Sequence, residues 1–513
     1  MSETTTFVRR KTHAVTVGKV QIGGDNPIRI QSMTNTPTLD TDASAAQIER
    51  IADAGADIVR LTAQGIAHAK NLENIEAAIH RDGYNIPLVA DIHFNPKVAM
   101  ESALYVEKVR INPGNFVDPA RTFKKLEYTD EEYLAEMEKI EAALLPLLER
   151  CHEHNTAIRI GVNHGSLSDR IMSRYGDTPA GMVESAMEFL RVCVKHNFMN
   201  VVISIKASNV SVMVETMRML AEAMAAESMT FPLHLGVTEA GDGEDGRVKS
   251  AIGIGSLLAM GIGDTIRVSL SEAPEAEIPV ARMLVAHIEK MTRNLQGVKK
   301  QQPASTPFVV GVDLTEKQCL QKYKVLKVSG NNAAADAELQ LLTTPEESVV
   351  LHAEYGPEMT ADEVCIAAAV DLGSLLLNGY GDGVWLTAPS LEEDKIKSLL
   401  FTILQSTRRR ITKTEFIACP SCGRTLFDLE GTLARVKAAT SHLPGLKIAV
   451  MGCVVNGPGE MADADYGYVG AAVNRISLYR GKQCVQMNIP EDLAIEKLIA
   501  ILKEDGKWIE PTL

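Results

Sequence analysis

The chain has 513 residues, of which 45% are hydrophobic, enough for two or three globular domains with sizeable cores. Its formal net charge of −14 argues against nonspecific binding to nucleic acid. Eight cysteines without regular spacing do not resemble a secreted disulfide framework, and no apolar run of about 18 residues indicates a membrane span. We therefore expect a cytoplasmic protein that binds neither a membrane nor nucleic acid.

Residues 28 to 271 alternate strand-like apolar runs with helix-like segments, which is typical of a parallel sheet with crossover helices. There are eight such runs: Ile28 to Thr34, Asp57 to Thr62, Pro87 to Phe94, Lys108 to Asn112, Ala157 to Asn163, Asn200 to Ser208, Pro232 to Glu239 and Asp264 to Ser269. Eight repeats of this length predict an α/β fold, a (β/α)8 TIM-type barrel. An open doubly wound sheet is the alternative.

Polar residues end each of these runs, and in a barrel they would meet at one mouth, where the active sites of this fold lie. Five ends carry a cation: Arg60, Arg110, Arg159, Lys206 and Arg267. These five cations, which we call the basic cup, would repel each other unless an anion lay among them, and guanidinium forks suit phosphate oxygens. The sequence thus predicts a site for a phosphate or diphosphate ester. Any single arginine could instead be a surface cation or half of an ion pair.

A glycine pattern near the last strand allows two interpretations. Gly253-Ile-Gly-Ser256 is followed by Gly261-Ile-Gly-Asp264. Such glycines could let backbone amides approach a phosphate, or could allow close helix packing. The sequence leaves both open.

The C-terminal part contains Cys419-Pro-Ser-Cys422, then Cys453 after a gap of 30 residues, and then Asn456-Gly-Pro-Gly-Glu460. Thiolates are the usual ligands of iron–sulfur clusters, whereas a carboxylate at the fourth iron would be weaker and more easily displaced. This arrangement predicts a cluster that does chemistry. A structural zinc site and unliganded thiols are the alternatives, although a zinc ribbon would need a further ligand pair.

Changes in the pattern of strand-like and helix-like segments predict three domains. Residues 1–295 form the predicted barrel, residues 296–407 an inserted α/β lobe that follows a linker-like stretch, and residues 408–513 a smaller α+β domain with the cysteines. In the last domain, Phe416 to Ala418 and Lys447 to Met451 are predicted strands that lead into the cysteine motifs. Hairpin-like strands and a final helix from Pro490 follow.

The chain resembles the 4-hydroxy-3-methylbut-2-enyl diphosphate synthases of the methylerythritol phosphate route to isoprenoids. The resemblance covers nearly the whole chain outside the insert. It rests on the motifs Gln31-Ser-Met-Thr-Asn-Thr36, Val89-Ala-Asp-Ile-His-Phe94, Arg110-Ile-Asn-Pro-Gly-Asn115, Ile160-Gly-Val-Asn163, His234-Leu-Gly-Val-Thr-Glu-Ala-Gly241 and Cys453-Val-Val-Asn-Gly-Pro-Gly-Glu460. The insert, and extra residues near 121 to 140, resemble the three-domain variant of the family, although the insert is short for it.

The resemblance implies reductive ring opening and dehydration of 2-C-methyl-D-erythritol 2,4-cyclodiphosphate, with two electrons delivered through a [4Fe-4S] cluster. It implies a cluster held by Cys419, Cys422, Cys453 and a replaceable Glu460, and a proton supplied by Glu239. The basic cup, with Asn163 and Ser269, would hold the diphosphate. Further substrate contacts are expected from Asp91, His93, Asn112, Ser208 and Asn456.

The resemblance also implies partners. The electron donor would be a flavodoxin or ferredoxin. Two-domain relatives close their site across a head-to-tail dimer, in which each barrel faces the partner's cluster domain, and we expect a homodimer here as well. An inserted lobe could instead place the cluster domain over its own barrel.

Two other functions remain compatible with the sequence. One is a cluster-free lyase or aldolase-like enzyme in which zinc bound by the cysteines is structural. The other is a non-catalytic iron–sulfur sensor whose barrel binds a phosphorylated metabolite.

Overall fold

The structure is a computed structural model, and it describes residues 8–117, 127–291, 295, 300–303, 305–329, 348–454, 459, 461 and 463–511. Eight parallel strands form one sheet in the order β8-β7-β6-β5-β4-β3-β10-β9. Their bounds are β3 Arg29–Met33, β4 Ile58–Thr62, β5 Leu88–Asp91, β6 Lys108–Ile111, β7 Ala157–Asn163, β8 Val201–Lys206, β9 His234–Leu235 and β10 Thr265–Ile266. A parallel bridge from Ile203 to Leu233 joins the two ends of this sheet. The predicted barrel is confirmed, and all eight predicted runs contain its strands.

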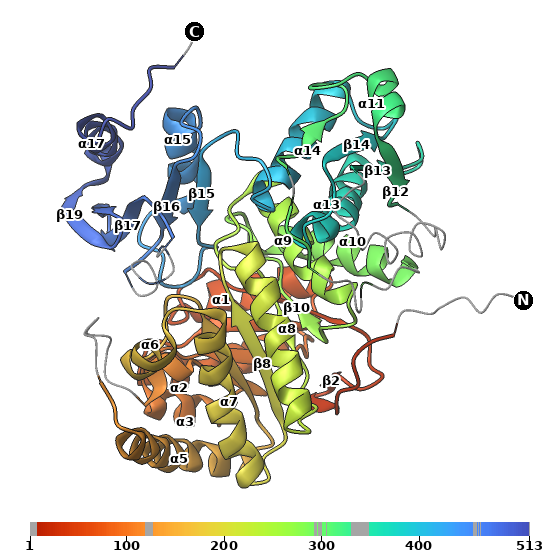
Figure 1. Cartoon of the computed structure of the whole chain (residues 1–513). Helices are drawn as coiled ribbons and strands as arrows, with labels where there is room; N and C mark the ends of the chain where they lie inside the picture. The colour runs from red at the N-terminus through yellow and green to blue at the C-terminus, as the bar shows by residue number, and fades with distance from the viewer. Residues whose placement is uncertain are drawn as a thin grey trace, which may run out of the picture.

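Helices surround the barrel strands, as Figure 1 shows. They are α1 Thr41–Asp53, α2 Ile66–Arg81, α3 Pro96–Ser102, α4 Pro113–Phe116, α5 Asp130–Glu153, α6 Asp169–Tyr175, α7 Pro179–Lys195, α8 Val210–Ala226, α9 Gly243–Leu258, the short 3-10 turn η1 Pro274–Ala276 and α10 Glu277–Lys290. Many begin at a residue whose side chain accepts a hydrogen bond from the first turn, such as Asp40, Thr178 and Asn209. Such caps satisfy amides that have no partner within the helix.

A hairpin of β1 (Val15–Val17) and β2 (Val20–Ile22) lies at the amino-terminal end of the barrel. Its apolar side chains pack against Ile58, Val89, Ala157 and Val202, which lie at or near the starts of four barrel strands. This small core covers the end opposite to the predicted mouth.

The inserted lobe is a four-stranded parallel sheet in the order β11-β14-β13-β12. Its elements are β11 Phe308–Val309, α11 Glu316–Lys322, β12 Lys324–Lys327, β13 Val349–Glu354, α13 Ala361–Leu377, β14 Gly383–Thr387 and α14 Glu393–Ser406. The predicted α/β character holds, although the sequence did not indicate β12, which is short and half-buried. Apolar residues of the lobe and of the barrel belong to one continuous core.

The glycines of α9 serve this packing. A Cβ at Gly255 would lie 2.5 Å from Val370 of α13, and a Cβ at Gly373 of α13 would lie 2.5 Å from Ile252 of α9. The two helices therefore approach closely where both lack side chains. Helix packing, and not phosphate binding, accounts for the Gly253-Ile-Gly-Ser256 stretch.

The C-terminal domain has its own core and a five-stranded sheet in the order β15-β16-β17-β18-β19. Its elements are β15 Glu415–Ala418, α15 Leu429–Thr440, β16 Lys447–Met451, β17 Tyr466–Ala472, β18 Arg475–Arg480, β19 Gln483–Pro490 and α17 Glu491–Glu504. The first three strands are parallel and the last two antiparallel, so the predicted α+β unit is confirmed.

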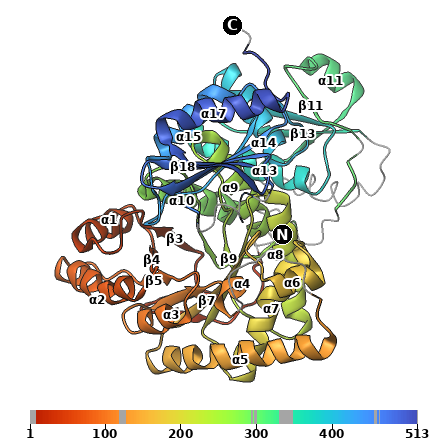
Figure 2. The same cartoon turned by 90° about the vertical axis from the view of Figure 1, so that its left-hand side faces the viewer.

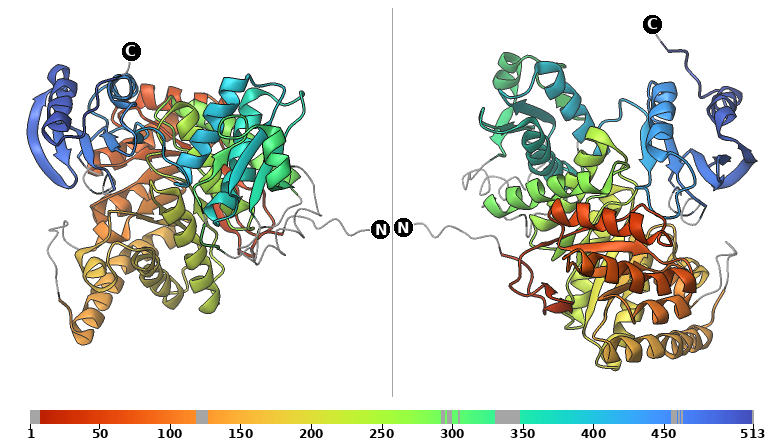
Figure 3. Two further views of the ribbon diagram at one scale, coloured as in Figure 1. Left: turned by 45° about the horizontal axis from the view of Figure 1, so that its top comes forward. Right: turned by 180° about the vertical axis from the view of Figure 1, so that it is seen from behind.

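The lobe and the C-terminal domain lie side by side on the same side of the barrel, with α9 beneath the gap between them (Figures 1 and 3). Turned by 90°, the molecule shows the C-terminal sheet above the barrel strands (Figure 2). In the part of the chain that the structure describes, no helix combines the length and the apolar character needed to cross a bilayer.

Candidate active site

Strand β15 brings the first cysteine motif to the barrel mouth. Ala418, the residue before Cys419, forms a parallel bridge with Ala240, the residue after Glu239. The hydroxyl of Ser271 donates to the carbonyl oxygen of Cys419 at 3.0 Å. The backbone of the C-terminal domain is thus joined directly to two loops that follow barrel strands.

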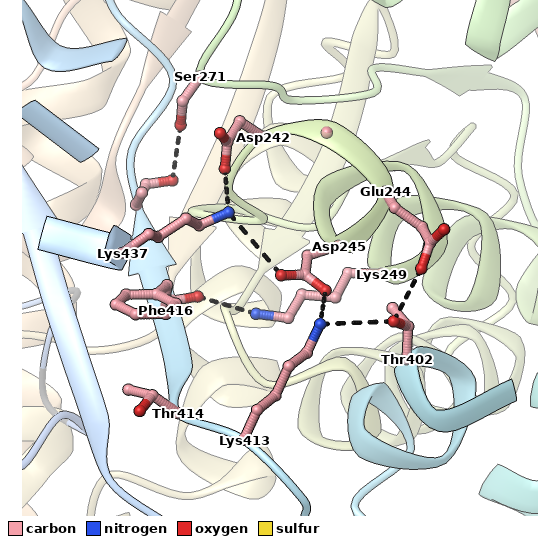
Figure 4. Close-up of polar contacts among 12 residues, drawn as sticks. Asp242, Glu244, Asp245, Lys249, Ser271, Thr402, Lys413, Thr414, Phe416 and Lys437 are labelled. Carbon is pink, nitrogen blue, oxygen red and sulfur yellow. Dashed lines mark hydrogen bonds and ion pairs between the residues drawn. The ribbon is translucent and has the colours of Figure 1, made fainter. Parts of the chain in front are cut away.

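Charged contacts around the N-terminus of α9 support this junction (Figure 4). The ammonium of Lys249, a buried residue of α9, donates to the carbonyl of Phe416 in β15 at 2.9 Å. Asp245 pairs with Lys413 at 2.7 Å and lies 3.8 Å from Lys437, which also pairs with Asp242. Together these contacts hold β15 and α15 against the barrel.

Glu244 of the same helix turn reaches the inserted lobe instead. Its carboxylate accepts hydrogen bonds from Ser398 and Thr402 of α14, at 3.2 and 3.0 Å. One helix end thereby contacts both of the other domains, so the lobe and the cysteine domain are fixed to a common support.

One cavity lies between the barrel mouth and the cysteine loops of the same chain. Its lining includes the whole basic cup and most of the other predicted residues: Arg60, Asp91, His93, Arg110, Arg159, Asn163, Lys206, Glu239, Arg267, Ser269, Cys419, Cys422 and Cys453. Residues more than 200 positions apart in the sequence therefore face one space. We call it the interdomain cavity.

The five cations of the basic cup are all buried, but only two have a carboxylate partner among the residues that the structure describes. Arg267 pairs with Glu277 through two hydrogen bonds of 2.9 and 3.1 Å, and Arg110 pairs with Asp91 at 3.0 Å. Among the described residues, Arg60, Arg159 and Lys206 form no ion pair. Burying a cation without a counter-charge is costly, so these three side chains are suited to an anionic ligand.

Weak acceptors and glycines accommodate these cations. The sulfur of Met33 accepts from Arg60 at 2.9 Å and lies 3.6 Å from Arg267; a thioether is a weak, uncharged acceptor, so it does not neutralise Arg60. A Cβ at Gly236 would lie 2.7 Å from the ammonium of Lys206, and one at Gly161 would lie 2.5 Å from Arg110. Glycine at these strand positions leaves the space that the cations occupy.

Repulsion among the cations of the basic cup contributes to lowered pKa values of Arg60 and Lys206. Burial lowers the pKa of Arg60 to about 10; Arg267 and Arg110 contribute to this lowering, and Asp91 opposes it only partly. Burial and the charges of Arg60 and Arg267 hold the pKa of Lys206 well below its usual range. An anion in the cavity would reverse both effects, since an opposite charge favours the charged form.

Asp91 and His93 form a hydrogen-bonded group with Arg110. The Nη1 of Arg110 donates to Asp91 and lies 2.9 Å from Nε2 of His93, while Nη2 donates to Asn163 at 3.2 Å. Burial alone would raise the pKa of Asp91, but Arg60 and Arg110 hold it well below its ordinary value. Burial, together with Arg110, lowers the pKa of His93 to about 3, so this imidazole is neutral and can accept from Arg110.

Glu239 follows β9 and is 3% exposed. Its φ of 51° lies in the left-handed region, which is uncommon for a residue with a side chain and is often kept at functional sites. This backbone conformation occurs one residue before the Ala240 bridge to the cysteine domain. A carboxyl group is therefore held between the basic cup and the cysteines.

The three cysteines face the cavity from two loops. The amide of Gly452 donates to the sulfur of Cys419 at 3.2 Å. Burial raises the pKa of the Cys419 thiol well above its ordinary value, and the neighbouring Cys453, Cys422 and Glu239 add to this effect. A bound metal centre would instead stabilise the thiolates, and an amide donor to sulfur is a feature of iron–sulfur sites.

The described residues also bear on the type of metal centre. No three His, Cys, Asp or Glu side chains among them converge closely enough to hold a single metal ion. The three thiols do line one cavity, and thiolates are ligands of both iron–sulfur clusters and zinc.

Several predicted residues lie elsewhere. Asn112 does not line the cavity; its side chain caps α4 by accepting from the amide of Gly114. Ser208 is buried at the end of β8, also off the cavity lining. Asn456 and Glu460 lie outside the described residues. Gly459 is described, and a Cβ there would lie 2.7 Å from the carbonyl of Gly165, so this part of the motif touches the loop after β7.

The cavity also contains residues that were not predicted as site residues. They are Met33, Thr238, Pro420, Arg424 and Met451, and Glu277 orients Arg267 from outside the lining. Arg424 had a sequence signal, because it follows Cys422 by two positions. Met33 and Glu277 had none, since their roles depend on strand and helix packing.

Fold and cavity define a (β/α)8-barrel enzyme that places a cation-lined mouth against a cysteine-lined domain. Two family models match the chain, the GcpE TIM-barrel domain over residues 12–282 and the GcpE protein C-terminal domain over residues 415–504. The chain therefore belongs to the GcpE family of 4-hydroxy-3-methylbut-2-en-1-yl diphosphate synthases, which confirms the resemblance and the expectation of an oxidoreductase of isoprenoid biosynthesis.

Curated relatives carry the name 4-hydroxy-3-methylbut-2-en-1-yl diphosphate synthase (flavodoxin). The protein of Bacteroides thetaiotaomicron is 48% identical over 607 residues, covering 98% of this chain and 99% of its own. That of Bacteroides fragilis is 49% identical, covering 99% and 97%. That of Protochlamydia amoebophila is 40% identical, covering 98% and 97%. The alignments are longer than this chain, so these relatives contain residues that it lacks.

Proposed function

We propose that the chain converts 2-C-methyl-D-erythritol 2,4-cyclodiphosphate to (E)-4-hydroxy-3-methylbut-2-enyl diphosphate by two-electron reduction, ring opening and loss of water. The observation that carries this proposal is the interdomain cavity, in which the basic cup faces three cysteines. Family membership and the named relatives support it. A diphosphate ester can reach both the cations and a redox centre only at such a junction.

The basic cup holds the diphosphate in this proposal. Arg60, Arg159 and Lys206, which have no carboxylate partner in the described part of the chain, supply charge, and Arg110 and Arg267 are oriented by Asp91 and Glu277. Guanidinium forks bind phosphate oxygens in pairs and fix the orientation of the ester. Ser269 and Asn163 line the same space and add neutral polar contacts.

Glu239 supplies the proton that lets a hydroxyl leave as water. The reaction needs a general acid between the phosphate site and the redox centre, and the carboxyl of Glu239 lies there, buried and held by the bridge at Ala240. A general acid must lie within reach of the hydroxyl that it protonates, and Glu239 lines the same cavity as the basic cup and the cysteines. His93, being neutral, adds no further positive charge.

Cys419, Cys422 and Cys453 hold a [4Fe-4S] cluster, and Glu460 completes its ligands. Such a cluster supplies electrons one at a time and a Lewis-acidic iron. The amide of Gly452 stabilises the sulfur of Cys419, and the surrounding buried residues exclude water from the site. The electron donor is a flavodoxin, as the names of the relatives indicate for those proteins.

The position of the C-terminal domain over the barrel of the same chain changes the role of the expected dimer. In this structure the C-terminal domain lies against the mouth of the barrel of its own chain. A shared site across a dimer is therefore not needed to bring cup and cysteines together. A homodimer remains a prediction, with a role other than completing the cavity.

An anaerobic assay tests the proposed function. Purified protein with its cluster, the cyclodiphosphate and a low-potential reductant should give the open-chain diphosphate, and the protein should be brown with broad absorption near ~400 nm, as expected for sulfur-to-iron charge transfer. A colourless zinc protein would support the lyase alternative. A brown protein that binds the ester without turnover would support the sensor.

A further inference from the structure

Lys108 crosses the interior of the barrel beneath the basic cup. It is the first residue of β6 and is 0% exposed, and its Nζ donates to the side-chain oxygen of Gln31 in β3 at 3.3 Å. Strands β4 and β5 separate β3 from β6 in the sheet, so this hydrogen bond spans the space that the strands enclose. Arg110 of the cup follows Lys108 by two positions, and alternate residues of a strand point to the same side. Lys108 therefore lies one layer deeper than the cup.

Other polar side chains share this deeper layer, although barrels of this fold usually fill their interior with branched apolar residues. His234 of β9 and Thr265 of β10 are fully buried there. In the part of the chain that the structure describes, both ring nitrogens of His234, the hydroxyl of Thr265 and the side-chain nitrogen of Gln31 have no hydrogen-bond partner. Unpaired polar groups in a protein interior cost free energy, so this layer requires an explanation other than stability.

The charged groups that act on Lys108 are cations. Among the described residues it forms no ion pair, and the charges that act on it are those of Arg159 and Arg60. The carboxylates at the level of the cup, Asp91 and Glu277, are already paired with arginines. The side chains that point into the barrel at these two levels are, in strand order, Gln31 of β3, Arg60 of β4, Val89 and Asp91 of β5, Lys108 and Arg110 of β6, Arg159 of β7, Ser204 and Lys206 of β8, His234 of β9, and Thr265 and Arg267, the latter just after β10.

These surroundings favour the neutral amine in the absence of a ligand. Burial, together with Arg159 and Arg60, holds the pKa of Lys108 well below its usual range. Burial and the charges of Arg159 and Lys206 do the same to the pKa of His234, so the histidine adds no charge to the layer. An anion in the cup would act in the opposite direction, because a nearby opposite charge favours the charged form of an amine.

We propose that Lys108 is a proton acceptor beneath the diphosphate site, which is neutral in the free enzyme and takes up one proton when the anion binds in the cup. The proposal rests on the proposed function, because it takes the ligand to be a diphosphate ester. Lys108 is not among the described residues that line the interdomain cavity, so it acts through the cup as a positioning residue. The proton moves from solvent to Nζ, and no bond of the ligand changes. A cation that forms only with the anion avoids the cost of one more buried, unpaired charge in the free enzyme.

Calorimetric titration counts the protons that accompany binding. The oxidised, cluster-loaded enzyme is titrated with the cyclodiphosphate, without reductant, in buffers of different ionisation enthalpy. Each phosphoryl group of this cyclic ligand has a single acidic proton, which is lost well below neutral pH, so the protons taken up go to the protein. The wild type should take up protons, and Lys108→Met should take up about 0.5–1 proton fewer per site. Its dissociation constant should rise about 10-fold.

The pH dependence of the affinity separates this role from a structural one. If the amine is neutral in the free enzyme and charged in the complex, a proton binds with the ligand. The affinity of the wild type should therefore fall as the pH rises from about 6 to about 9. The fall should be smaller in Lys108→Met, with a remainder from Lys206 of the cup. A residue that served packing alone would change the affinity by the same factor at each pH.

Three further variants serve as controls. Lys19→Met makes the same change at an exposed lysine in the turn between β1 and β2, at the opposite end of the barrel, and should behave as the wild type. Lys108→Gln also removes the amine and should give the same loss of proton uptake, and it replaces Lys108→Met if thermal unfolding shows that the methionine variant is not folded. His234→Gln tests the other titratable side chain of the layer and should keep most of the uptake.

The outcomes distinguish failure of this inference from failure of the proposed function. Equal proton uptake in the wild type, Lys108→Met and Lys108→Gln would overturn the inference, and so would loss of the uptake in His234→Gln alone. In both cases the ligand still binds, and the proposed function stands. If the wild type does not bind the cyclodiphosphate, the cup is not a diphosphate site, and the proposed function fails together with the inference.

Discussion

Ala240 and Ala418 form a parallel β-bridge, although 177 residues separate them in the chain and they belong to different domains. The first follows Glu239 and the second precedes Cys419, so one backbone contact fixes the proposed acid beside a proposed cluster ligand. The contacts of Lys249 with Phe416 and of Ser271 with Cys419 support the same strand. The candidate active site thus lies at a junction between two domains of one chain.

Glu460→Ala should retain substantial iron but lose most turnover, because a carboxylate ligand is replaceable while thiolates anchor the cluster. Cys453→Ala should lose the cluster. Iron analysis and visible spectra of both variants, beside the anaerobic assay, check this. A fully active Glu460→Ala would refute the replaceable-ligand role.

Lys206→Ala should weaken binding of diphosphate ligands without changing the visible spectrum, because the proposed role of Lys206 is to contact the ligand and not the metal centre. It should leave the folded state intact, since it removes a buried cation that repels its neighbours. Calorimetry with inorganic diphosphate and thermal unfolding measure the two effects.

Arg267→Ala should also weaken diphosphate binding, and it should in addition lower the free energy of unfolding. The change leaves Glu277, 2% exposed, without its partner, and breaking a buried pair in this way costs about 3–5 kcal/mol. The double variant Arg267→Met with Glu277→Gln should regain much of the stability and none of the affinity. Equal affinity of the wild type and both single variants, Lys206→Ala and Arg267→Ala, would make the cup a structural ion-pair network.

Lys249→Met should lower turnover about 10- to 100-fold through misplacement of the cysteine strand, with a smaller effect on KM. The variant removes the hydrogen bond to the Phe416 carbonyl, and methionine keeps the bulk of the side chain. Lys482→Ala, an exposed lysine of the same domain as Phe416, is the control. If Lys249→Met turned over as fast as the control, the polar junction would have no positioning role.

His93 should make the folded state acid-sensitive. Its pKa is 6.5 in the unfolded chain but is lowered to about 3 by burial and Arg110, so the unfolded state binds the extra proton first. Stability should therefore fall as the pH drops from about 6.5 toward about 3. His93→Gln should reduce this loss by roughly 2 kcal/mol between about pH 7 and 4.5, by urea unfolding. Identical pH dependence in both proteins would contradict a buried neutral imidazole.

The barrel and most of the site could be predicted because strand ends are visible in the sequence. Arg60, Arg110 and Lys206 follow buried apolar runs, and parallel strands bring such ends together. The partners Met33 and Glu277 could not be predicted, since the strand and helix that carry them meet the cup only after packing. The place of Asn112 off the cavity lining could not be predicted, because an asparagine after a strand serves equally well as a helix cap.

The placement of the C-terminal domain, which carries the cysteines, could not be predicted from the sequence either. It depends on the few contacts between α9, the lobe and β15, which join residues of all three domains. Their lysines and aspartates are ordinary surface residue types. Only the folded arrangement shows that Lys413 and Asp245 belong to one junction.

The most direct test of the account is a complementation experiment with Arg60→Ala and Cys453→Ala, each inactive alone. The two variants are mixed under conditions in which any dimers exchange subunits, the cluster is reconstituted, and turnover of the cyclodiphosphate is measured. In the account, the cavity of each chain is formed by its own barrel and its own cysteines. Every cavity in a mixed assembly then has either the Arg60→Ala or the Cys453→Ala defect, and the mixture should stay inactive. Partial recovery of activity would show that cup and cysteines come from different chains, and would contradict the account.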